Sequence, residues 1–155
     1  MINVNLRNDL LSLITGKSKS ITGSGFCYLG LSTSTPNADG SNFKEPTTAA
    51  SYARVQLNVN SAMQYTDVFG IVSDGTVTNV EEICTHECLE EEGWGEFTHF
   101  GIFGQETGGT PLAFDLLTDP DGEPDENGVY PAKTLTITKN KVAVFRKGTL
   151  QLKLI

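Results

Sequence analysis

The hydrophobic and polar positions of residues 93–114, GWGEFTHFGIFGQETGGTPLAF, follow the pattern of two β-strands joined by a tight turn. Aromatic and β-branched residues favour a pleated strand, and the glycine pair in the polar segment 105–109 suits a turn that needs positive φ. The sequence therefore predicts a hairpin, and no catalytic group stands out inside it. We expect its apolar residues to form a ridge in the core: Phe97, Phe100, Ile102, Phe103, Leu112 and Phe114.

Alternation with a period of two predicts further strands on either side of this hairpin. Residues 26–33 carry apolar groups on both faces, which predicts a central strand. Residues 52–59 alternate cleanly, so we expect one set to face inward and the other outward: Val55, Leu57 and Val59, and Arg54, Gln56 and Asn58. The polar run 41–51 before them is expected to be an exposed loop. The other predicted strands are residues 69–72, 76–88, 134–138, 142–145 and 150–154, although helical spacing also fits part of 76–88.

One segment has the period of a helix. Apolar residues recur at steps of three and four over residues 3–14, and Gly16 follows them, which predicts a short amphipathic helix. The Ser-, Thr- and Gly-rich residues 18–25 form a connector. We therefore expect two parts, a helix with its connector over residues 1–25 and a β-domain over residues 26–155. The predicted fold is all-β, an antiparallel β-sandwich or jelly-roll-like barrel with one short N-terminal helix.

Composition narrows the function classes. The net charge of −8 and a pI of about 4.6 argue against a nucleic-acid partner, because such binding depends on Lys and Arg displacing counterions. No window approaches the roughly 20 apolar residues that span a bilayer, and no secretory signal pattern is present, so neither membrane insertion nor secretion is expected. The three cysteines predict thiols made in a reducing compartment, the cytoplasm of the cell that makes the protein.

Two segments carry residue types that bind metals. Cys84, His86 and Cys88 would share one side of a strand, but their spacing is not a standard zinc pattern and no fourth ligand is evident. Space-filling cysteines and a His at the rim are the alternative. The loop 119–128 offers oxygen ligands at alternate positions, which suits calcium: Asp119, Asp121, Glu123, Asp125 and Asn127. It lacks the EF-hand pattern, and a solvated acidic loop is the alternative that we favour, so we expect no cofactor, with calcium left open.

Catalytic patterns are missing from the sequence. Only two histidines are present, with no nucleophile elbow and no Gly-rich phosphate loop. His99, within a predicted strand, fits a hydrogen-bonded sheet residue better than a general base. A sugar- or partner-binding surface remains as an alternative, with Trp94 and Tyr130 flanking loops and the turn residues Gln105, Glu106 and Thr107 beside them. Trp94 lies between glycines, and we favour the alternative that it is a plug over the edge of the core.

Three segments together resemble a known family. These are YLGLSTSTPNADGSNFKEPTTAASYARVQL at 28–57, EEGWGEFTHFGIFGQETGGTPLAFDLLT at 91–118 and FRKGTLQLKL at 145–154. They are similar to small virion proteins of tailed bacteriophages that are usually described as tail fibre proteins. In that family a strand precedes the Trp-Gly pair, which is why we predict a strand over residues 76–88. The acidic loop and the C-x-H-x-C triplet depart from the family pattern.

The resemblance implies a non-enzymatic structural component of the virion. We expect a tail fibre or baseplate appendage that acts in assembly or host attachment, and a homo-oligomer that contacts other virion proteins. The alternatives are a capsid decoration (head fibre) protein, or a carbohydrate-binding module that contacts a glycan of the host surface.

Overall fold

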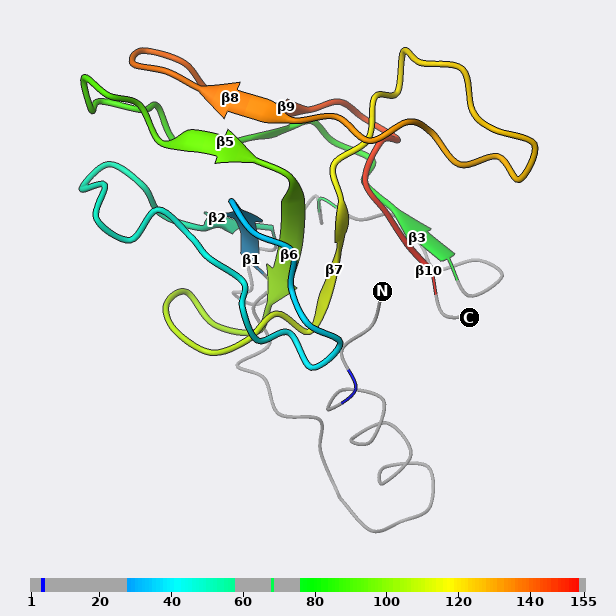
Figure 1. Cartoon of the computed structure of the whole chain (residues 1–155), viewed down its shortest axis with the longest axis horizontal. Coiled ribbons are helices and arrows are strands. Elements are labelled where there is room, and N and C mark those ends of the chain that lie inside the picture. Colours follow the sequence, from blue (N-terminus) through cyan, green and yellow to red (C-terminus); the bar gives the residue numbers. More distant parts are fainter. Residues whose placement is uncertain (1–3, 5–27, 58–67, 69–75, 154–155) are drawn as a thin grey trace, which may run out of the picture.

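The computed structural model describes residues 4, 28–57, 68 and 76–153 of the chain. These residues form short strands, and every pairing between them is antiparallel. Figure 1 shows their arrangement. The strands are β1 (Tyr28–Ser32), β2 (Val55–Gln56), β3 (Thr76–Thr78), β4 (Ile83–Cys84), β5 (Gly95–Phe97), β6 (His99–Phe103), β7 (Ala113–Leu116), β8 (Leu135–Ile137), β9 (Val144–Phe145) and β10 (Gln151–Lys153).

A four-stranded sheet with the order β2-β1-β6-β7 forms the centre, and the pairs β10-β3, β4-β9 and β5-β8 surround it (Figure 1). The predicted hairpin is confirmed as β6 and β7, with Ile102 opposite Ala113 and His99 opposite Leu116. The predicted central position of the first strand is also confirmed, since β1 lies between β2 and β6. The segment before β6 leaves this sheet, because β5 pairs with β8 instead.

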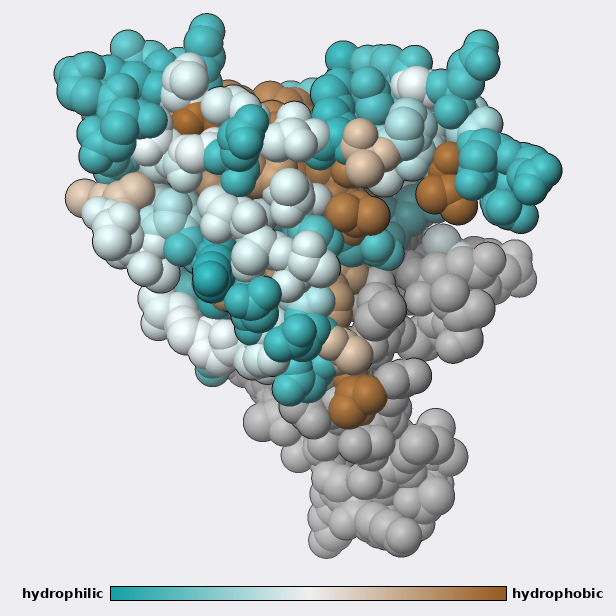
Figure 2. Space-filling view, in the orientation of Figure 1, coloured by the Kyte–Doolittle hydropathy of each residue, from teal (hydrophilic) through white to brown (hydrophobic). Residues whose placement is uncertain are grey.

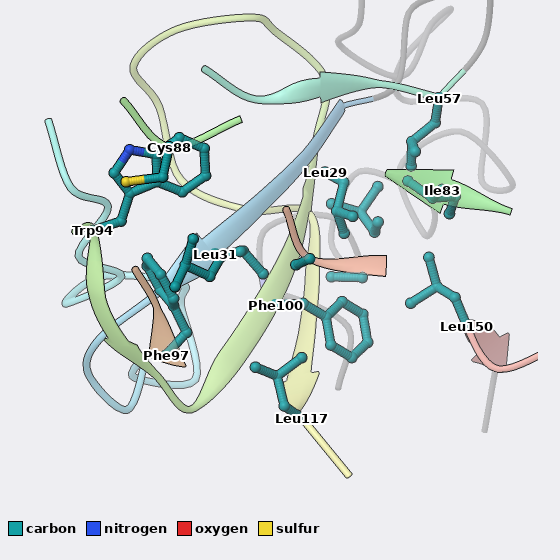
Figure 3. Close-up of a cluster of buried hydrophobic side chains, with 14 residues drawn as sticks. Leu29, Leu31, Leu57, Ile83, Cys88, Trp94, Phe97, Phe100, Leu117 and Leu150 are labelled. Atoms are coloured by element: carbon teal, nitrogen blue, oxygen red, sulfur yellow. The ribbon is translucent and has the colours of Figure 1, made fainter. Parts of the chain in front are cut away.

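Both faces of β6 are covered, because all five of its residues are buried. On one face, Phe100 and Ile102 lie beside Leu31 and Leu29 of β1, their partners in the register. That face packs against residues of the smaller strand pairs (Figure 3), and the cluster is Leu29, Leu31, Leu57, Ile83, Cys88, Trp94, Phe97, Phe100, Ile102, Ala113, Leu117, Ile137, Ala143 and Leu150. This two-layered apolar core is what a sandwich requires.

The opposite face of β6 is covered by the loop that precedes β2. The Phe43 ring meets the Phe103 ring edge-on at 5.1 Å between centroids. Gly101 has the Phe43 ring so close that a Cβ there would lie 2.6 Å from it. The expected single ridge is therefore divided between two faces, with Phe103 and Phe114 away from the main cluster and Leu112 only partly buried. Residues 41–51 form the expected loop, but the loop is exposed only in part, because Phe43 and Glu45 are half-buried.

The predicted alternation fails at Arg54 within residues 52–57, the part of this segment that the structure describes. Leu57 is buried and Gln56 is exposed, as expected, but Arg54 is only 6 % exposed. The Arg54 side chain does not reach water, because Glu45 of the loop over β6 and the turn at residues 105–108 bind its guanidinium. Predicting that Arg54 faces solvent was therefore wrong.

The all-β, antiparallel class is confirmed for the described residues, and their strands do not close into a barrel. The predicted helix over residues 3–14 is not seen: apart from Val4, it lies outside the described residues, as do the predicted strand 69–72 and the boundary at residue 25. The predicted strand 76–88 appears as β3 and β4, separated by residues 79–82. Within the described residues, no helix is long and apolar enough to cross a bilayer.

Candidate functional site

The turn between β6 and β7, residues 104–110, is an exposed polar projection that we call the hairpin tip. Gln105, Glu106 and Thr107 present exposed side chains there. Gly108 and Gly109 have φ values of 69° and 67°, which confirms the predicted need for positive φ. A Cβ at Gly109 would collide with the side-chain amide of Gln105. The positive φ is what favours glycine at this position, because the exposed Gln105 side chain could move aside.

The buried side chain of Arg54 binds the backbone of the hairpin tip. Its Nη1 donates to the carbonyl oxygens of Gln105 at 2.8 Å and Gly108 at 2.9 Å. Its guanidinium also lies over the Phe103 ring, 3.3 Å from the centroid. One buried cation therefore binds both sides of the turn and the strand that leads into it.

Glu45 balances the charge of Arg54. Its carboxylate accepts from Arg54 Nε at 2.9 Å and from Nη2 at 2.6 Å, a two-point contact that fixes the guanidinium plane. The Tyr52 hydroxyl donates to Glu45 Oε1 at 2.9 Å and accepts from the Leu31 amide at 3.0 Å. Burial, with the Glu45 charge adding to it, raises the pKa of Tyr52 far above its ordinary value, so this hydroxyl keeps its proton. We call this chain of contacts from β1 to the tip the Arg54 clamp.

Trp94 does not form an exposed platform. It is 4 % exposed, and its indole N–H donates to Glu90 Oε2 at 2.8 Å and to Ser51 Oγ at 3.0 Å. Its ring meets the Tyr52 ring edge-on at 5.2 Å. Ser51 also donates from its hydroxyl and its amide to the Glu90 carboxylate. These two hydrogen bonds are the main reason that the pKa of Glu90 is lowered to about 2. The arrangement fits the plug at the core edge that was the alternative for Trp94.

Tyr130 is 42 % exposed, on the long loop between β7 and β8. In Figure 1 that loop and the start of β5, which follows Trp94, lie on opposite sides of the molecule, and the hairpin tip occupies a third position. The structure therefore does not bring together the residues expected to contact a glycan or partner. The tip residues Gln105, Glu106 and Thr107 are the members of that set that lie together in an exposed turn.

The acidic loop uses its carboxylates internally. Asp119 accepts from Lys133 Nζ at 2.9 Å, and Asp121 accepts from Arg146 Nη1 at 3.1 Å. Asp125 accepts from the amides of Asn127 and Val129, each at 2.9 Å, and these bonds lower its pKa. Glu123 and Asn127 are exposed. No group of three metal-binding side chains comes together in the described part of the chain, so this loop shows no gathered calcium site.

The C-x-H-x-C triplet is also spread out. Strand β4 ends at Cys84, so the alternation of faces does not continue to residue 88. Cys84 and His86 are exposed, whereas Cys88 is buried, and burial raises the pKa of its thiol. The three side chains therefore do not share the single face that the zinc hypothesis needs.

The two histidines do not assemble a catalytic centre with the groups around them. His99 is buried in β6 with its Nδ1 2.8 Å from Thr98 Oγ1, and burial lowers its pKa, so it is neutral at pH 7. His86 is exposed on a different segment. This placement agrees with the interpretation of His99 as a hydrogen-bonded sheet residue.

An apolar groove with a volume of about 240 Å³ lies beside β7 and β9. Phe100, Leu117 and Leu150 form its floor, and Leu116 and Val144 line it although they are 44 % and 48 % exposed. Figure 2 shows patches of hydrophobic surface between hydrophilic groups on the face in view. Neither histidine lines this groove. Sequence analysis missed it, because its walls come from segments that are distant in the chain.

The Arg54 clamp was missed for a related reason. Strand alternation assigned Arg54 to solvent, and no local pattern links it to the turn at residues 105–108. The one available signal was the co-occurrence of Glu45, Tyr52 and Arg54 in a short polar segment ahead of a strand. That signal does not identify the carbonyl groups that the cation binds.

Comparison with known protein families gives a match over most of the chain. The family model described as Podophage GP4 fiber I protein gp80 matches residues 2–153. No curated protein matches the chain. The family match covers nearly the whole sequence and confirms the resemblance to phage fibre proteins that the three sequence segments indicated. The chain belongs to the family of the Podophage GP4 fiber I protein gp80, a family of structural phage fibre proteins.

Proposed function

We propose that this protein is a non-enzymatic fibre component of a tailed phage particle, part of a tail or baseplate appendage, that presents the hairpin tip to a partner during assembly or host attachment. Membership of the fibre family is the observation that carries the structural role. On this proposal the protein is a component of the phage particle that acts through exposed surfaces such as the hairpin tip.

The Arg54 clamp supports the choice of the hairpin tip. A turn that is fixed before contact loses little conformational freedom on binding, so its exposed groups bind more tightly than those of a mobile loop. The buried Arg54 guanidinium fixes both the Gln105 and the Gly108 carbonyl groups, leaving the side chains of residues 105–107 outside. Burying an ion pair carries a desolvation cost that its own attraction need not repay, so the Arg54–Glu45 pair supports a role in fixing the conformation of this turn.

Imaging of intact particles tests the location. Cryo-electron microscopy of particles, with an antibody fragment against this chain as a marker, is expected to show copies on the tail or baseplate. Copies on the head instead would favour the capsid decoration alternative. Absence of the chain from the particle would refute the structural role altogether.

Adsorption of phage particles to host cells tests whether the hairpin tip contacts the host. Particles that carry Thr107→Arg are expected to assemble normally if the tip meets the host, and to adsorb more slowly because a bulky cation interrupts the contact. Particles that carry Thr136→Arg, an exposed position on β8, are the matched control. Equal adsorption by the two variants and the unmodified particle would remove the tip from host attachment.

A carbohydrate-binding module is the second candidate, and the polar, uncovered tip is the observation that favours it. Hydroxyl, amide and carboxylate groups on Thr107, Gln105 and Glu106 are suited to hydrogen bonds with sugar hydroxyls. Glycan-array binding by the purified protein that is lost in Thr107→Ala, but retained in Tyr130→Ala, would assign the sugar to the tip. A protein that binds no glycan on the array would exclude this candidate.

A further inference from the structure

We infer that Gly30 is a positioning residue for the hairpin tip and that it acts through the Arg54 clamp. This inference rests on the proposed function, because it names a residue that sets the conformation of the proposed contact surface. Gly30 is buried in the middle of β1. Its φ is not positive, so backbone conformation does not require glycine at this position. The reason for glycine is therefore sought in the space around it.

The central sheet leaves a gap at Gly30 that the loop over β6 fills. Gly30 lies opposite Gly101 of β6, and the β1–β2 register, continued by one residue, puts Arg54 on its other side. Residues opposite one another in a sheet point to the same face. Without side chains of their own, the two glycines leave room there for Phe43 and Glu45. A Cβ at Gly101 would lie 2.6 Å from the Phe43 ring, and a Cβ at Gly30 would lie 2.7 Å from Glu45 Oε1.

A methyl group at Gly30 would press on both groups that hold the Arg54 guanidinium. Its nearest neighbours would be Glu45 Oε1 at 2.7 Å and Phe103 Cε2 at 2.8 Å. Glu45 Oε1 accepts from Arg54 Nε and from the Tyr52 hydroxyl, and the guanidinium lies over the Phe103 ring. The Glu45 side chain could move aside only by giving up these hydrogen bonds. The space at Gly30 is therefore what allows Glu45 to reach Arg54.

The orientation of Arg54 in turn sets the conformation of the hairpin tip. Its Nε and Nη2 donate to Glu45, whereas its Nη1 donates to the carbonyl oxygens of Gln105 and Gly108. The guanidinium is planar and rigid, so a carboxylate that fixes two of its nitrogens also fixes the direction of the third. Displacing Glu45 therefore frees Nη1 to leave the tip. Gly30 controls the tip through Glu45 and Arg54 in succession.

Cleavage by a glutamyl endopeptidase, resolved by peptide mass spectrometry, tests this role in the purified full chain. Glu106 in the tip and Glu126 in the acidic loop are both exposed. Cleavage requires the backbone to open locally, so its rate follows the population of the open form. In Gly30→Ala, the ratio of cleavage after Glu106 to cleavage after Glu126 is expected to rise on the order of tenfold, the effect of losing a hydrogen bond to a charged group. An unchanged ratio in the folded variant would overturn the inference.

Two further variants separate this role from general instability. Ile83→Ala is the matched control, because it removes a buried side chain of the main cluster and weakens the whole domain. It is expected to leave the ratio unchanged, and a rise equal to that of Gly30→Ala would overturn the inference. Glu45→Gln keeps the volume of the side chain but loses its charge, so the ratio is expected to rise there too. Circular dichroism checks folding, and an unchanged ratio in Glu45→Gln would refute the inference even if Gly30→Ala does not fold.

The Arg54→Met background tests whether Gly30 acts through the clamp. The tip carbonyl groups have already lost their donor in this variant, so adding Gly30→Ala is expected to change the ratio by less than about twofold. A full additional rise would show that Gly30 acts by another route. These measurements need no host cell, so their failure would leave the fibre role and the Thr107→Arg adsorption test standing. Equal adsorption in that test would remove the tip from host attachment without changing which residues position it.

Discussion

Arg54 and Glu45 form an ion pair that is nearly removed from solvent, with side-chain exposures of 4 % and 12 %. The pair joins the loop over β6 to the strand β2, and Arg54 carries the link onward to the hairpin tip. Because both side chains are buried, water cannot hydrate either charge if its partner is removed. The local stability of the tip therefore depends on a contact between residues that the chain separates from it by about fifty positions.

Removing Arg54 is expected to be strongly destabilising. Arg54→Met leaves the Glu45 charge buried and unpaired, which costs about 3–5 kcal/mol of the free energy of unfolding, as measured by urea denaturation. The double variant Arg54→Met with Glu45→Met is expected to recover part of this loss, because no charge then remains unpaired. Arg146→Met, which breaks a pair exposed by 64 % and 66 %, is the control and should cost less than about 1 kcal/mol. Similar losses in the two single variants would contradict the buried pair.

Gly101 is required for space. In Gly101→Ala the new methyl group meets the Phe43 ring, so we expect a loss of about 1–3 kcal/mol in the free energy of unfolding. Adding Phe43→Leu is expected to recover some of that loss by removing the ring, which distinguishes a clash from a general weakness of β6. No recovery in the double variant would indicate that another neighbour, such as Pro111, is the obstacle.

We expect the hydrogen bond from Trp94 to Glu90 to weaken well below pH 4.5, because the Glu90 carboxylate is protonated there. The pKa of Glu90 falls from 4.5 to about 2 in the folded chain, so its stabilising contribution is complete above pH 4.5 and is lost as the pH falls from there toward 2. The chain has one tryptophan, so its fluorescence reports this site alone. The emission should hold steady down to about pH 4.5 and change only below it. Glu90→Gln should show the altered emission already at neutral pH; an unchanged emission there would separate Trp94 from Glu90.

His99 contributes a second pH dependence at higher pH. Its pKa is lowered below 6.5 by burial, so the unfolded chain takes up a proton first, and stability is lost as the pH falls from about 6.5 to the lower pKa of the folded state. Thermal melting between pH 7 and pH 5 should therefore show a falling melting temperature in the unmodified chain. In His99→Gln this part of the slope should be smaller. An equal slope in both proteins would assign the effect to other groups.

Calcium is expected to have no effect on the melting temperature. Asp119 and Asp121 already pair with Lys133 and Arg146, and Asp125 caps its own turn, so a cation would have to displace these contacts. Melting curves with added calcium and with a chelator should coincide. A rise with calcium that disappears in Asp121→Asn would show that the loop rearranges into a site.

The sequence by itself determined the local elements. The alternation of apolar residues placed β1 and β8, and the glycine pair at residues 108 and 109 located the hairpin turn, because these features depend on neighbours in the chain. The three segments that carry the family resemblance also identified the family that the comparison confirmed. Composition argued against a nucleic-acid partner, since net charge is a property of the residues alone.

Only the tertiary structure decided which side chains meet water. Arg54 is buried because a loop covers the second face of the central sheet, and strand alternation carries no information about such a cover. Trp94 is buried in the main core cluster, where Tyr52 packs against its ring and Glu90 and Ser51 accept from its indole N–H. The groove between Leu116 and Val144 exists because β7 and β9 approach each other from distant parts of the chain. Burial is a long-range property, and it determined both the Arg54 clamp beneath the tip and the apolar groove beside β7 and β9.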